Sequence, residues 1–249
     1  MILKLKAFIK RRLPTSLKNW LKDSPLNLLR VTYRNFEFRF IAPRVFGQSA
    51  EDFLLQRWLP ERDGTYIDVG AGEPVRGSNT YVFYKQGWRG ILVEPIRLNC
   101  QVLKLLRPQD EILQILVGNI DSVVDFYEFE PYQYSTTLKS VAANCLDKSI
   151  RLKSVSQIGI VPLSSFAPNM TPDQPTLISI DVEGADLAVL ESNDWSRTRP
   201  RAICVEEWNH LLSGGVLEAF LTERNYKRVS YTGLSSIYIE LTYLQSFEN

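Results

Sequence analysis

The stretch TYIDVGAGE, residues 65–73, decides the fold. Its first half suits a short buried strand, and Gly70 and Gly72 then let the backbone turn tightly and approach a ligand closely. Asp68 precedes the turn, where its carboxylate can organise the loop and accept a hydrogen bond from an amine-bearing ligand. A plain strand-to-helix turn has the same pattern, so neighbouring segments must distinguish the two.

Strand-like and helix-like segments alternate along the chain around this stretch. The alternation predicts βαβ units and therefore an α/β fold: a doubly wound, mostly parallel sheet with helices on both faces. Residues 226–231 and 237–241 are expected to pair as closing strands, and residues 130–137 form a polar, aromatic loop. The other predicted strands are residues 90–93, 112–117, 123–129, 158–161, 177–180 and 202–206, and the predicted helices are residues 50–59, 78–86, 96–106, 184–191 and 215–224.

Glu94 ends the strand that follows the glycine turn, 24 residues after Gly70. An acidic residue about 20 residues beyond a glycine loop suits ribose hydroxyls, which donate hydrogen bonds to the carboxylate. The pair therefore predicts an adenosine-type ligand, either NAD or S-adenosylmethionine. Because the loop lacks a full G-x-G-x-x-G, a dinucleotide is the less favoured of the two.

Polar residues also follow three later strands. Asn119 could meet an adenine edge, since an amide both donates and accepts, and a turn residue is an equally good interpretation. Asp181 and Glu183 leave one strand just before a glycine, where paired acids could orient an acceptor hydroxyl, take its proton, bind a metal or cap the next helix. Glu206 ends the next strand and is favoured as a site residue over His210, the only histidine.

In this order along the chain, the motifs resemble the FkbM-type methyltransferases, a branch of the class I, Rossmann-like methyltransferases. The resemblance covers residues 46–241 and implies S-adenosylmethionine as methyl donor and, most often, a hydroxyl oxygen as acceptor. Ser179 departs from the family, which often has Lys at this place. The matching segments are FGQSAED at 46–52, DVGA at 68–71, GSNTY at 77–81, KQGWRGI at 85–91, EP at 94–95 and IDVEGA at 180–185.

Carried over residue by residue, the resemblance places Asp68, Gly70 and Ala71 along the methionine end of the donor. It implies that Asn79 and Thr80 support that end, that Glu94 holds the ribose, and that Asp181 and Glu183 lie near the transferred methyl. No metal is required. The complete cofactor-binding prediction is Asp68, Gly70, Ala71, Gly72, Glu73, Asn79, Thr80, Glu94, Pro95, Asn119, Asp181 and Val182, and the candidate bases are Asp181, Glu183 and Glu206.

Residues 1–45 form a basic helical extension ahead of the predicted methyltransferase domain, residues 46–249. Residues 1–46 carry eleven Lys or Arg against two Asp or Glu, a net charge of +9, and the remainder carries 18 against 26, a net charge of −8. Residues 1–22 suit basic amphipathic helices, which can lie on an anionic bilayer. A solvated tail, or a helix packed on the acidic body, fits the pattern equally well.

Several features indicate a cytoplasmic protein, with or without peripheral contact at the inner membrane face. No apolar run approaches the ~20 residues of a membrane span, and lysines interrupt the N-terminal region that a signal peptide would fill. Three cysteines without a CxxC pair fit a reducing compartment and argue against a disulfide framework or a zinc site.

The main functional hypothesis is an O-methyltransferase that acts on a sugar hydroxyl of a glycan or glycolipid precursor, the sugar resting on family analogy. A nicotinamide-dependent oxidoreductase is an alternative, because it would use the same sheet and the same Glu94. A binding protein with a degenerate cofactor pocket is a second alternative. A nucleic-acid acceptor is disfavoured, because the body is acidic and shows no aromatic and basic binding face.

Overall fold

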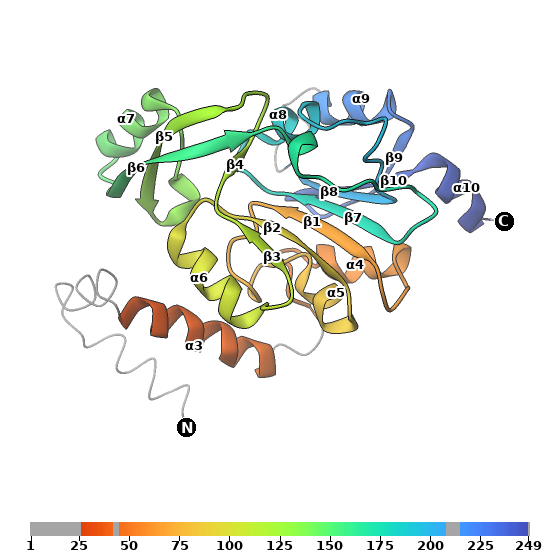
Figure 1. The fold of residues 1–249 in the computed structure, drawn as a ribbon, viewed down its shortest axis with the longest axis horizontal. Coiled ribbons are helices and arrows are strands. Elements are labelled where there is room, and N and C mark those ends of the chain that lie inside the picture. The colour runs from red at the N-terminus through yellow and green to blue at the C-terminus, as the bar shows by residue number, and fades with distance from the viewer. Residues whose placement is uncertain (1–25, 42–44, 208–214, 249) are drawn as a thin grey trace.

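The structure is a computed structural model that describes residues 26–41, 45–207 and 215–248. At its centre lies a seven-stranded sheet in the order β3-β2-β1-β7-β8-β10-β9 (Figure 1). Neighbouring strands are parallel except β10, which is antiparallel to β8 and β9. The predicted doubly wound, mostly parallel α/β sheet is confirmed. Its strands are β1 Thr65–Val69, β2 Arg89–Val93, β3 Glu111–Leu113, β7 Thr176–Ile180, β8 Ala202–Glu206, β9 Tyr226–Tyr231 and β10 Ser235–Glu240.

Helices cover both faces of this sheet, and each face has its own apolar core. Successive strand residues point to opposite faces, so Tyr66 joins one core and Ile67 the other. The first core packs against α4 Glu51–Trp58, α5 Tyr81–Gln86, α6 Arg97–Leu106 and α10 Leu241–Glu248, and the second against α8 Asp186–Glu191 and α9 Val216–Thr222. Because both faces are buried, the central strands are continuous apolar runs.

A second, smaller sheet is inserted between β3 and β7. It consists of β4 Leu116–Val117, β6 Arg151–Val161 and β5 Ser122–Glu130, in that spatial order. β5 and β6 form a long antiparallel ribbon, and the short β4 pairs in parallel with the end of β6. The connection between the two long strands contains the 3₁₀ turn η1 Tyr132–Tyr134 and the helix α7 Lys139–Asp147, and η2 Leu163–Ser165 follows the insertion.

The insertion corrects the expected single strand at residues 112–117. The chain leaves the main sheet after Leu113 and enters the second sheet at Leu116, so the expected strand is divided between two sheets. The helix α7 and the first half of β6 were not predicted, because most of their side chains are exposed and lack a buried periodicity.

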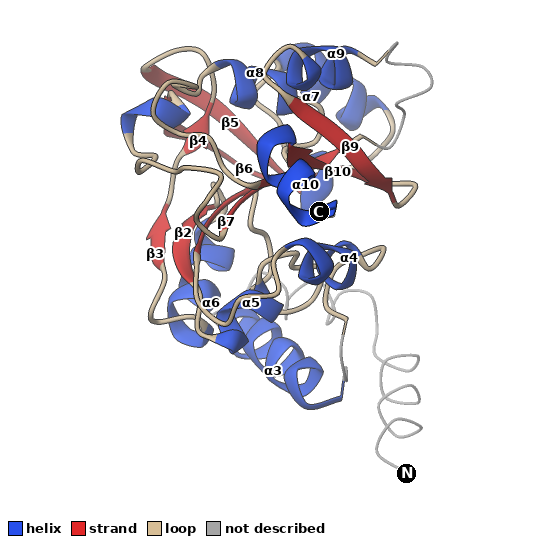
Figure 2. Cartoon of the chain, turned by 90° about the vertical axis from the view of Figure 1, so that its right-hand side faces the viewer, coloured by secondary structure: helices blue, strands red, loops and turns tan. Residues whose placement is uncertain are grey.

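Helix α3, Leu26–Ile41, lies beside α5 and α6, away from α8 and α9 (Figure 2). It lies within the predicted basic helical extension, residues 1–45, although the individual helices of that extension were placed only within residues 1–22. The amphipathic helices predicted within residues 1–22 lie outside the described residues. None of the described helices combines the length and the apolar character needed to cross a bilayer.

Candidate active site

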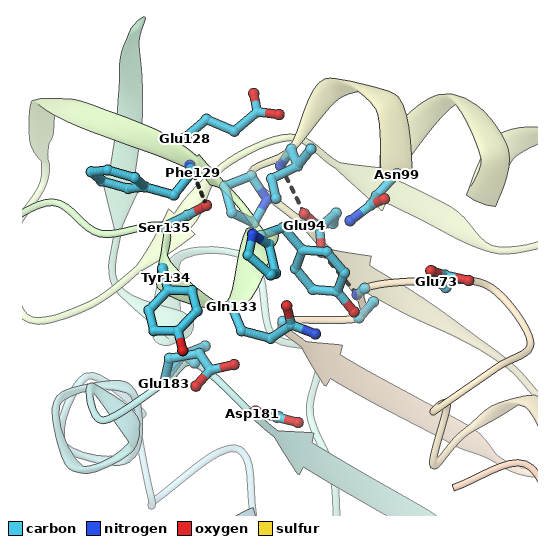
Figure 3. A pocket seen from close by; sticks show the side chains of 18 of the residues that line it. Glu73, Glu94, Asn99, Glu128, Phe129, Gln133, Tyr134, Ser135, Asp181 and Glu183 are labelled. Atoms are coloured by element: carbon cyan, nitrogen blue, oxygen red, sulfur yellow. Dashed lines mark hydrogen bonds between the residues drawn. The ribbon is translucent and has the colours of Figure 1, made fainter. Parts of the chain in front are cut away.

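A cavity of about 1190 Å³ opens at the carboxyl ends of β1, β2 and β7. This is the edge at which ligands bind in open α/β sheets. Its floor is the glycine loop after β1, and its roof comes from the inserted sheet, which brings Gln133 and Tyr134 over the space between Glu94 and the end of β7 (Figure 3). The volume exceeds that of a typical small-molecule pocket, about 300–1,000 Å³, so donor and acceptor can share it.

The glycine loop is held between the two strands that flank β1. The backbone N–H groups of Gly70 and Ala71 donate to the Val93 carbonyl at 2.9 and 3.0 Å. Gly70 has φ +81°, and a Cβ there would lie 1.9 Å from the carbonyl oxygen of Asp181. Position 70 therefore requires glycine because of the close contact with the backbone of Asp181 as well as because of the backbone conformation.

Glu94 is buried at the end of β2 and ties this loop to the next helix. Its Oε2 accepts a 2.8 Å hydrogen bond from Gly72 N–H, and its Oε1 accepts one of 2.8 Å from Ile96 N–H. Burial raises the pKa of Glu94 to about 7, and these two bonds act in the opposite direction. Each oxygen keeps a second lone pair, so a pair of vicinal hydroxyls from the cavity can still be accepted.

Asp68 and Thr80 lie beneath the glycine loop and do not line the cavity. The Thr80 hydroxyl donates to Asp68 Oδ2 at 2.5 Å. Burial raises the pKa of Asp68, and the nearby Arg107 opposes the rise. The expected contact of Asp68 with the donor is thus corrected, because its side chain faces α5 and supports the loop from below. Thr80 contacts Asp68, and its support of the donor stays a prediction.

The cation beside Asp68 is Arg107, which is fully buried. Its Nε donates to Asp110 at 2.7 Å, and its Nη atoms donate to the Thr80 hydroxyl at 3.0 and 3.1 Å and to Tyr66 at 2.8 Å. Ser179, which replaces the lysine frequent in the family, pairs with Asp68 across the β1–β7 register. Ser179 brings no charge to this position, and among the described residues the positive charge that acts on Asp68 is that of Arg107.

Asp181 stands at the end of β7, where its backbone N–H donates to the Val69 carbonyl at 2.9 Å. It lines the large cavity and also a smaller adjoining hollow of about 10 Å³, which Glu206 and Asn79 line as well. Burial, followed by the charge of Glu206, raises the pKa of Asp181 to about 8. Burial and the charge of Glu183 raise that of Glu206 to about 7. These carboxyls are proton acceptors suited to neutral pH.

Val182 and Glu183 line the cavity next to Asp181. Glu183 has φ +56°, an unusual conformation for a residue with a side chain and one that concentrates at functional sites. The turn is fixed by Asp186, whose carboxylate accepts from Val182 N–H at 3.2 Å and Gly184 N–H at 3.1 Å. The capping role weighed for the acidic pair is not observed, because the N-cap of α8 is Ala185 and it makes no side-chain hydrogen bond.

The sequence predicted this roof only as a polar, aromatic loop. Tyr132 in η1 points its hydroxyl toward the glycine loop, 3.6 Å from the place where a Cβ on Gly72 would lie. Gln133, Tyr134 and Glu128 add further polar groups to the same wall. The roof therefore offers several hydrogen-bonding groups opposite Asp181.

Helix α3 forms a further wall, which sequence reasoning missed. Asn35 donates to Glu73 Oε2 at 3.0 Å and accepts from the N–H groups of Val75 and Arg76, both at 3.3 Å. Arg34 forms an ion pair with the other oxygen of Glu73. Glu73 lines the cavity as predicted, and its carboxylate is engaged by α3.

Besides Asp68 and Thr80, three predicted residues lie away from the main cavity. Asn119 is exposed, and its amide donates to Glu191 on α8 at 2.8 Å, so the expected adenine contact is corrected. The part of the cavity wall near Glu94 is apolar and is formed by Ile96, Leu116 and Val117. Asn79 and Glu206 reach only the smaller hollow. Pro95, Gly72 and Ala71 line the large cavity, and their contact with the cofactor stays a prediction. His210 lies outside the described residues.

The entry segment of the resemblance is also ordered around the site. Glu51 accepts from Ser49 N–H at 2.8 Å, and Asp52 accepts from Phe46 N–H at 2.7 Å. Both carboxylates are buried, and they fold the segment so that Gly47 lines the cavity. In the described part of the chain, no group of three or more His, Cys, Asp or Glu is arranged to hold a metal ion.

The family model of the methyltransferase FkbM domain matches residues 68–228, which include the glycine loop, Glu94 and the Asp181 turn. The chain belongs to the FkbM methyltransferase family. It is therefore an S-adenosylmethionine-dependent methyltransferase, and the nicotinamide-dependent oxidoreductase and the non-catalytic binding protein are set aside. No curated protein sequence matches the chain significantly.

Solved structures with a similar arrangement include a TehB-like SAM-dependent methyltransferase from Corynebacterium glutamicum, 11% identical, with a TM-score of 0.45, covering 87% of this chain and 100% of that one. An O-methyltransferase from Bacillus cereus in complex with SAH is 12% identical, with a TM-score of 0.42 and coverage of 91% and 98%. A methyltransferase from Geobacter sulfurreducens is 12% identical, with a TM-score of 0.40 and coverage of 96% of each chain.

The cavity fits S-adenosylmethionine as the family implies. Glu94 offers its remaining lone pairs to ribose hydroxyls, and the apolar wall beside it suits the adenine. The backbone of Gly70 and Gly72 leaves room for the methionine part, and the acidic end of β7 suits the positive sulfonium.

Proposed function

We propose that this methyltransferase transfers its methyl group to a hydroxyl oxygen of a sugar in a glycan or glycolipid precursor. The observation that carries the proposal is Asp181, a partly buried carboxyl that lines the cavity beside Glu183 and has a pKa raised to about 8. A hydroxyl needs such a base, because its proton must leave as the new bond to oxygen forms. Several polar groups on the roof, among them Gln133 and Tyr134, support an acceptor with many hydroxyls.

The chemistry demands mainly alignment. S-adenosylmethionine supplies a methyl group on a sulfonium sulfur, which is already electrophilic. Glu94 and the glycine loop fix the donor, and the polar roof holds the acceptor oxygen in line with the carbon to be attacked. Asp181 then accepts the hydroxyl proton as the oxygen–carbon bond forms and the carbon–sulfur bond breaks, with S-adenosylhomocysteine as the leaving group. A positive charge bound beside Asp181 lowers its pKa, so the base ionises when the donor site is filled.

Glu206 has a positioning role in this proposal. It reaches the hollow behind Asp181 and does not line the large cavity. Its charge keeps the pKa of Asp181 high, after the larger effect of burial. Glu183 lies at the cavity wall and remains a second candidate for contact with the acceptor.

Transfer of labelled methyl from S-adenosylmethionine into fractionated cell extract tests the proposal. We expect label in a carbohydrate-containing fraction, as an alkali-stable ether, and loss of transfer in Asp181→Asn with affinity for S-adenosylhomocysteine retained. Label on nitrogen, or label in nucleic acid, would contradict the hydroxyl acceptor. Tight cofactor binding without transfer to any fraction would contradict the acceptor class altogether.

We also propose that residues 1–22 bring a cytoplasmic enzyme to the anionic inner face of a membrane. Seven of these residues are Lys or Arg and none is Asp or Glu, and each basic residue near an anionic surface adds about 1 kcal/mol. Vesicles that contain anionic lipid should retain more of the full chain than vesicles without it. Both kinds of vesicle should retain a chain beginning at Ser24 equally. The shortening stops there because α3 lines the cavity.

A further inference from the structure

We propose that Arg30, Arg34 and Arg76 form a binding site for a phosphate or diphosphate group of the acceptor. The inference rests on the proposed function, since it names the chemical class of that acceptor. Arg30 and Arg34 are four residues apart on α3, which places them on one helix face, and Arg76 lies in the loop beyond Glu73. All three line the cavity.

The three guanidinium groups lie close enough to influence one another. Burial lowers the pKa of Arg34, and the charges of Arg76 and Arg30 lower it further. Within the described ranges, the ion pair of this cluster joins Arg34 to Glu73, and neither Arg30 nor Arg76 has an acidic partner. Three positive charges against one negative charge leave this wall of the cavity with a net charge of +2, which attracts an anion.

The cluster is also held in place before any ligand arrives. Asn27 accepts a 2.9 Å hydrogen bond from Arg30 Nε, and Asn35 joins α3 to the backbone of the loop that carries Arg76. The Nε atom of Arg34 is buried and has no hydrogen-bond partner. Guanidinium groups match pairs of phosphate oxygens with two parallel hydrogen bonds, so a fixed set of three suits a phosphate or diphosphate.

The position of the cluster favours the acceptor over the donor as its ligand. The family model matches residues 68–228, which include Arg76, whereas Arg30 and Arg34 lie outside that segment. Features that differ between relatives are expected to serve the acceptor, because function is set by sites added to a common fold. The donor's positive sulfonium is served by the opposite, acidic wall.

Tyr132 shows that the two walls face one cavity. Its pKa is raised by burial and by the charges of Glu94 and Asp181, and it is lowered by Arg34. A sugar joined to a phosphate could therefore place its anionic end on the arginines and a hydroxyl near Asp181. Activated sugars carry such a group whether they are linked to a nucleotide or to a lipid.

Calorimetric titration of the full chain with inorganic pyrophosphate, in the presence of saturating S-adenosylhomocysteine, tests the site. We expect pyrophosphate to bind, and the double variant Arg30→Gln/Arg76→Gln to bind it at least about tenfold more weakly. The control is Arg62→Gln, which replaces an exposed arginine outside the cavity and should leave binding unchanged. Failure of the unaltered chain to bind pyrophosphate would overturn the proposal, as would equal binding by the double variant.

Two further measurements separate the remaining outcomes. A parallel loss of affinity for S-adenosylhomocysteine in the double variant would assign the arginines to the donor and overturn the proposal. Displacement of pyrophosphate by a nucleoside diphosphate sugar would identify a soluble acceptor. Retention on phosphatidylcholine vesicles that contain a polyprenyl diphosphate, if it depends on the arginines, would identify a lipid-linked acceptor. Absence of both results would contradict the acceptor assignment. Failure of the proposed function itself would show differently, as absent methyl transfer while pyrophosphate still binds.

Discussion

The backbone N–H of Gly72 donates a 2.8 Å hydrogen bond to the carboxylate of Glu94. This hydrogen bond links the glycine loop after β1 to the acid after β2. Glu94→Gln keeps the size of the side chain but replaces one acceptor oxygen by a donor. We expect it to weaken binding of S-adenosylhomocysteine by at least about tenfold, because one charge-assisted bond to the loop or to Ile96 is lost. Calorimetry measures the change.

The matched control for Glu94 is Asn119→Ala. The Asn119 amide is bonded to Glu191, outside the cavity, so its removal should leave the same affinity within about twofold, a difference below 0.5 kcal/mol. A tenfold loss in Asn119→Ala would restore the adenine contact that the structure corrects.

Cofactor binding should depend on pH through Glu94. Its pKa is raised to about 7 by burial, and ribose hydroxyls donate to the ionised form. Affinity for S-adenosylhomocysteine should therefore rise with pH, by up to about tenfold per unit below 7, and level off above it. Titrations between acidic and mildly alkaline buffers check this, and the slope should vanish in Glu94→Gln. A slope that persists in the variant would assign it to another group.

The two positive-φ glycines of the loop should differ sharply in tolerance. Gly70→Ala places a Cβ 1.9 Å from the Asp181 carbonyl, a backbone atom that cannot move freely. Gly72→Ala meets the Tyr132 hydroxyl at 3.6 Å and the Gly70 carbonyl at 3.9 Å, both ordinary contacts, so its cost is limited to backbone strain of about 1–2 kcal/mol. Thermal unfolding should show a much larger loss for Gly70→Ala. Equal losses of thermal stability in the two variants would mean that the Asp181 carbonyl does not contact the loop closely.

Asp181→Asn should lose activity and gain stability at alkaline pH. The pKa of Asp181 rises from 3.8 to about 8 on folding, so the folded state binds a proton more tightly than the unfolded chain. That stabilisation is complete below the unfolded value and is lost as pH rises through about 8. The variant should therefore melt further above the unaltered protein at pH about 8.5 than at pH about 5, where only a small part of the stabilisation is lost. Its kcat should fall about 10²–10⁴-fold. An equal melting difference at both pH values would contradict this account.

Arg107 should be essential for stability although it touches no ligand. Arg107→Met leaves Asp110 and Asp68 buried without their cation, which costs about 3–5 kcal/mol of unfolding free energy. Urea denaturation measures this loss, and the exposed Arg62→Gln should change the same quantity by less than about 0.5 kcal/mol. Arg107→Met/Asp110→Leu should recover part of it, because one buried charge is removed with its partner. No recovery would indicate that packing, not charge, is lost.

The central sheet and the acidic strand ends could be predicted because each rests on local sequence. Buried parallel strands are continuous apolar runs, and the turns after them carry glycines or acids within a few residues, as around Gly70, Glu94 and Asp181. Asp68 was predicted as a ligand contact because sequence fixes position along a strand but does not show which neighbours fill its face. It is influenced by the Thr80 hydroxyl, just ahead of α5, and by the charge of Arg107, just after α6.

The cavity walls outside the sheet could not be predicted in the same way. Arg30 and Arg34 belong to a segment whose charge suggested a solvated or membrane-bound arm, and only the packing of α3 brings them to the site. Arg107, next to a proline, has the sequence character of an exposed helix end, yet it is fully buried. Long-range contacts determine where these arginines lie, and such contacts leave no periodic pattern in the sequence.

The pairing of β4 with the end of β6 has a consequence for how such enzymes diversify. Leu116 lies opposite Ile160, and Val117 opposite Val161, so the roof begins and ends at one place beside the main sheet. The segment between forms a detour that packs on the rest of the domain through a small apolar cluster of Phe126 and Ile158 with Ile96, so beyond that cluster it can lengthen, shorten or be exchanged without shifting β1, β2 or β7. New acceptors can thus be acquired by grafting a different detour, while the donor site beneath is inherited unchanged.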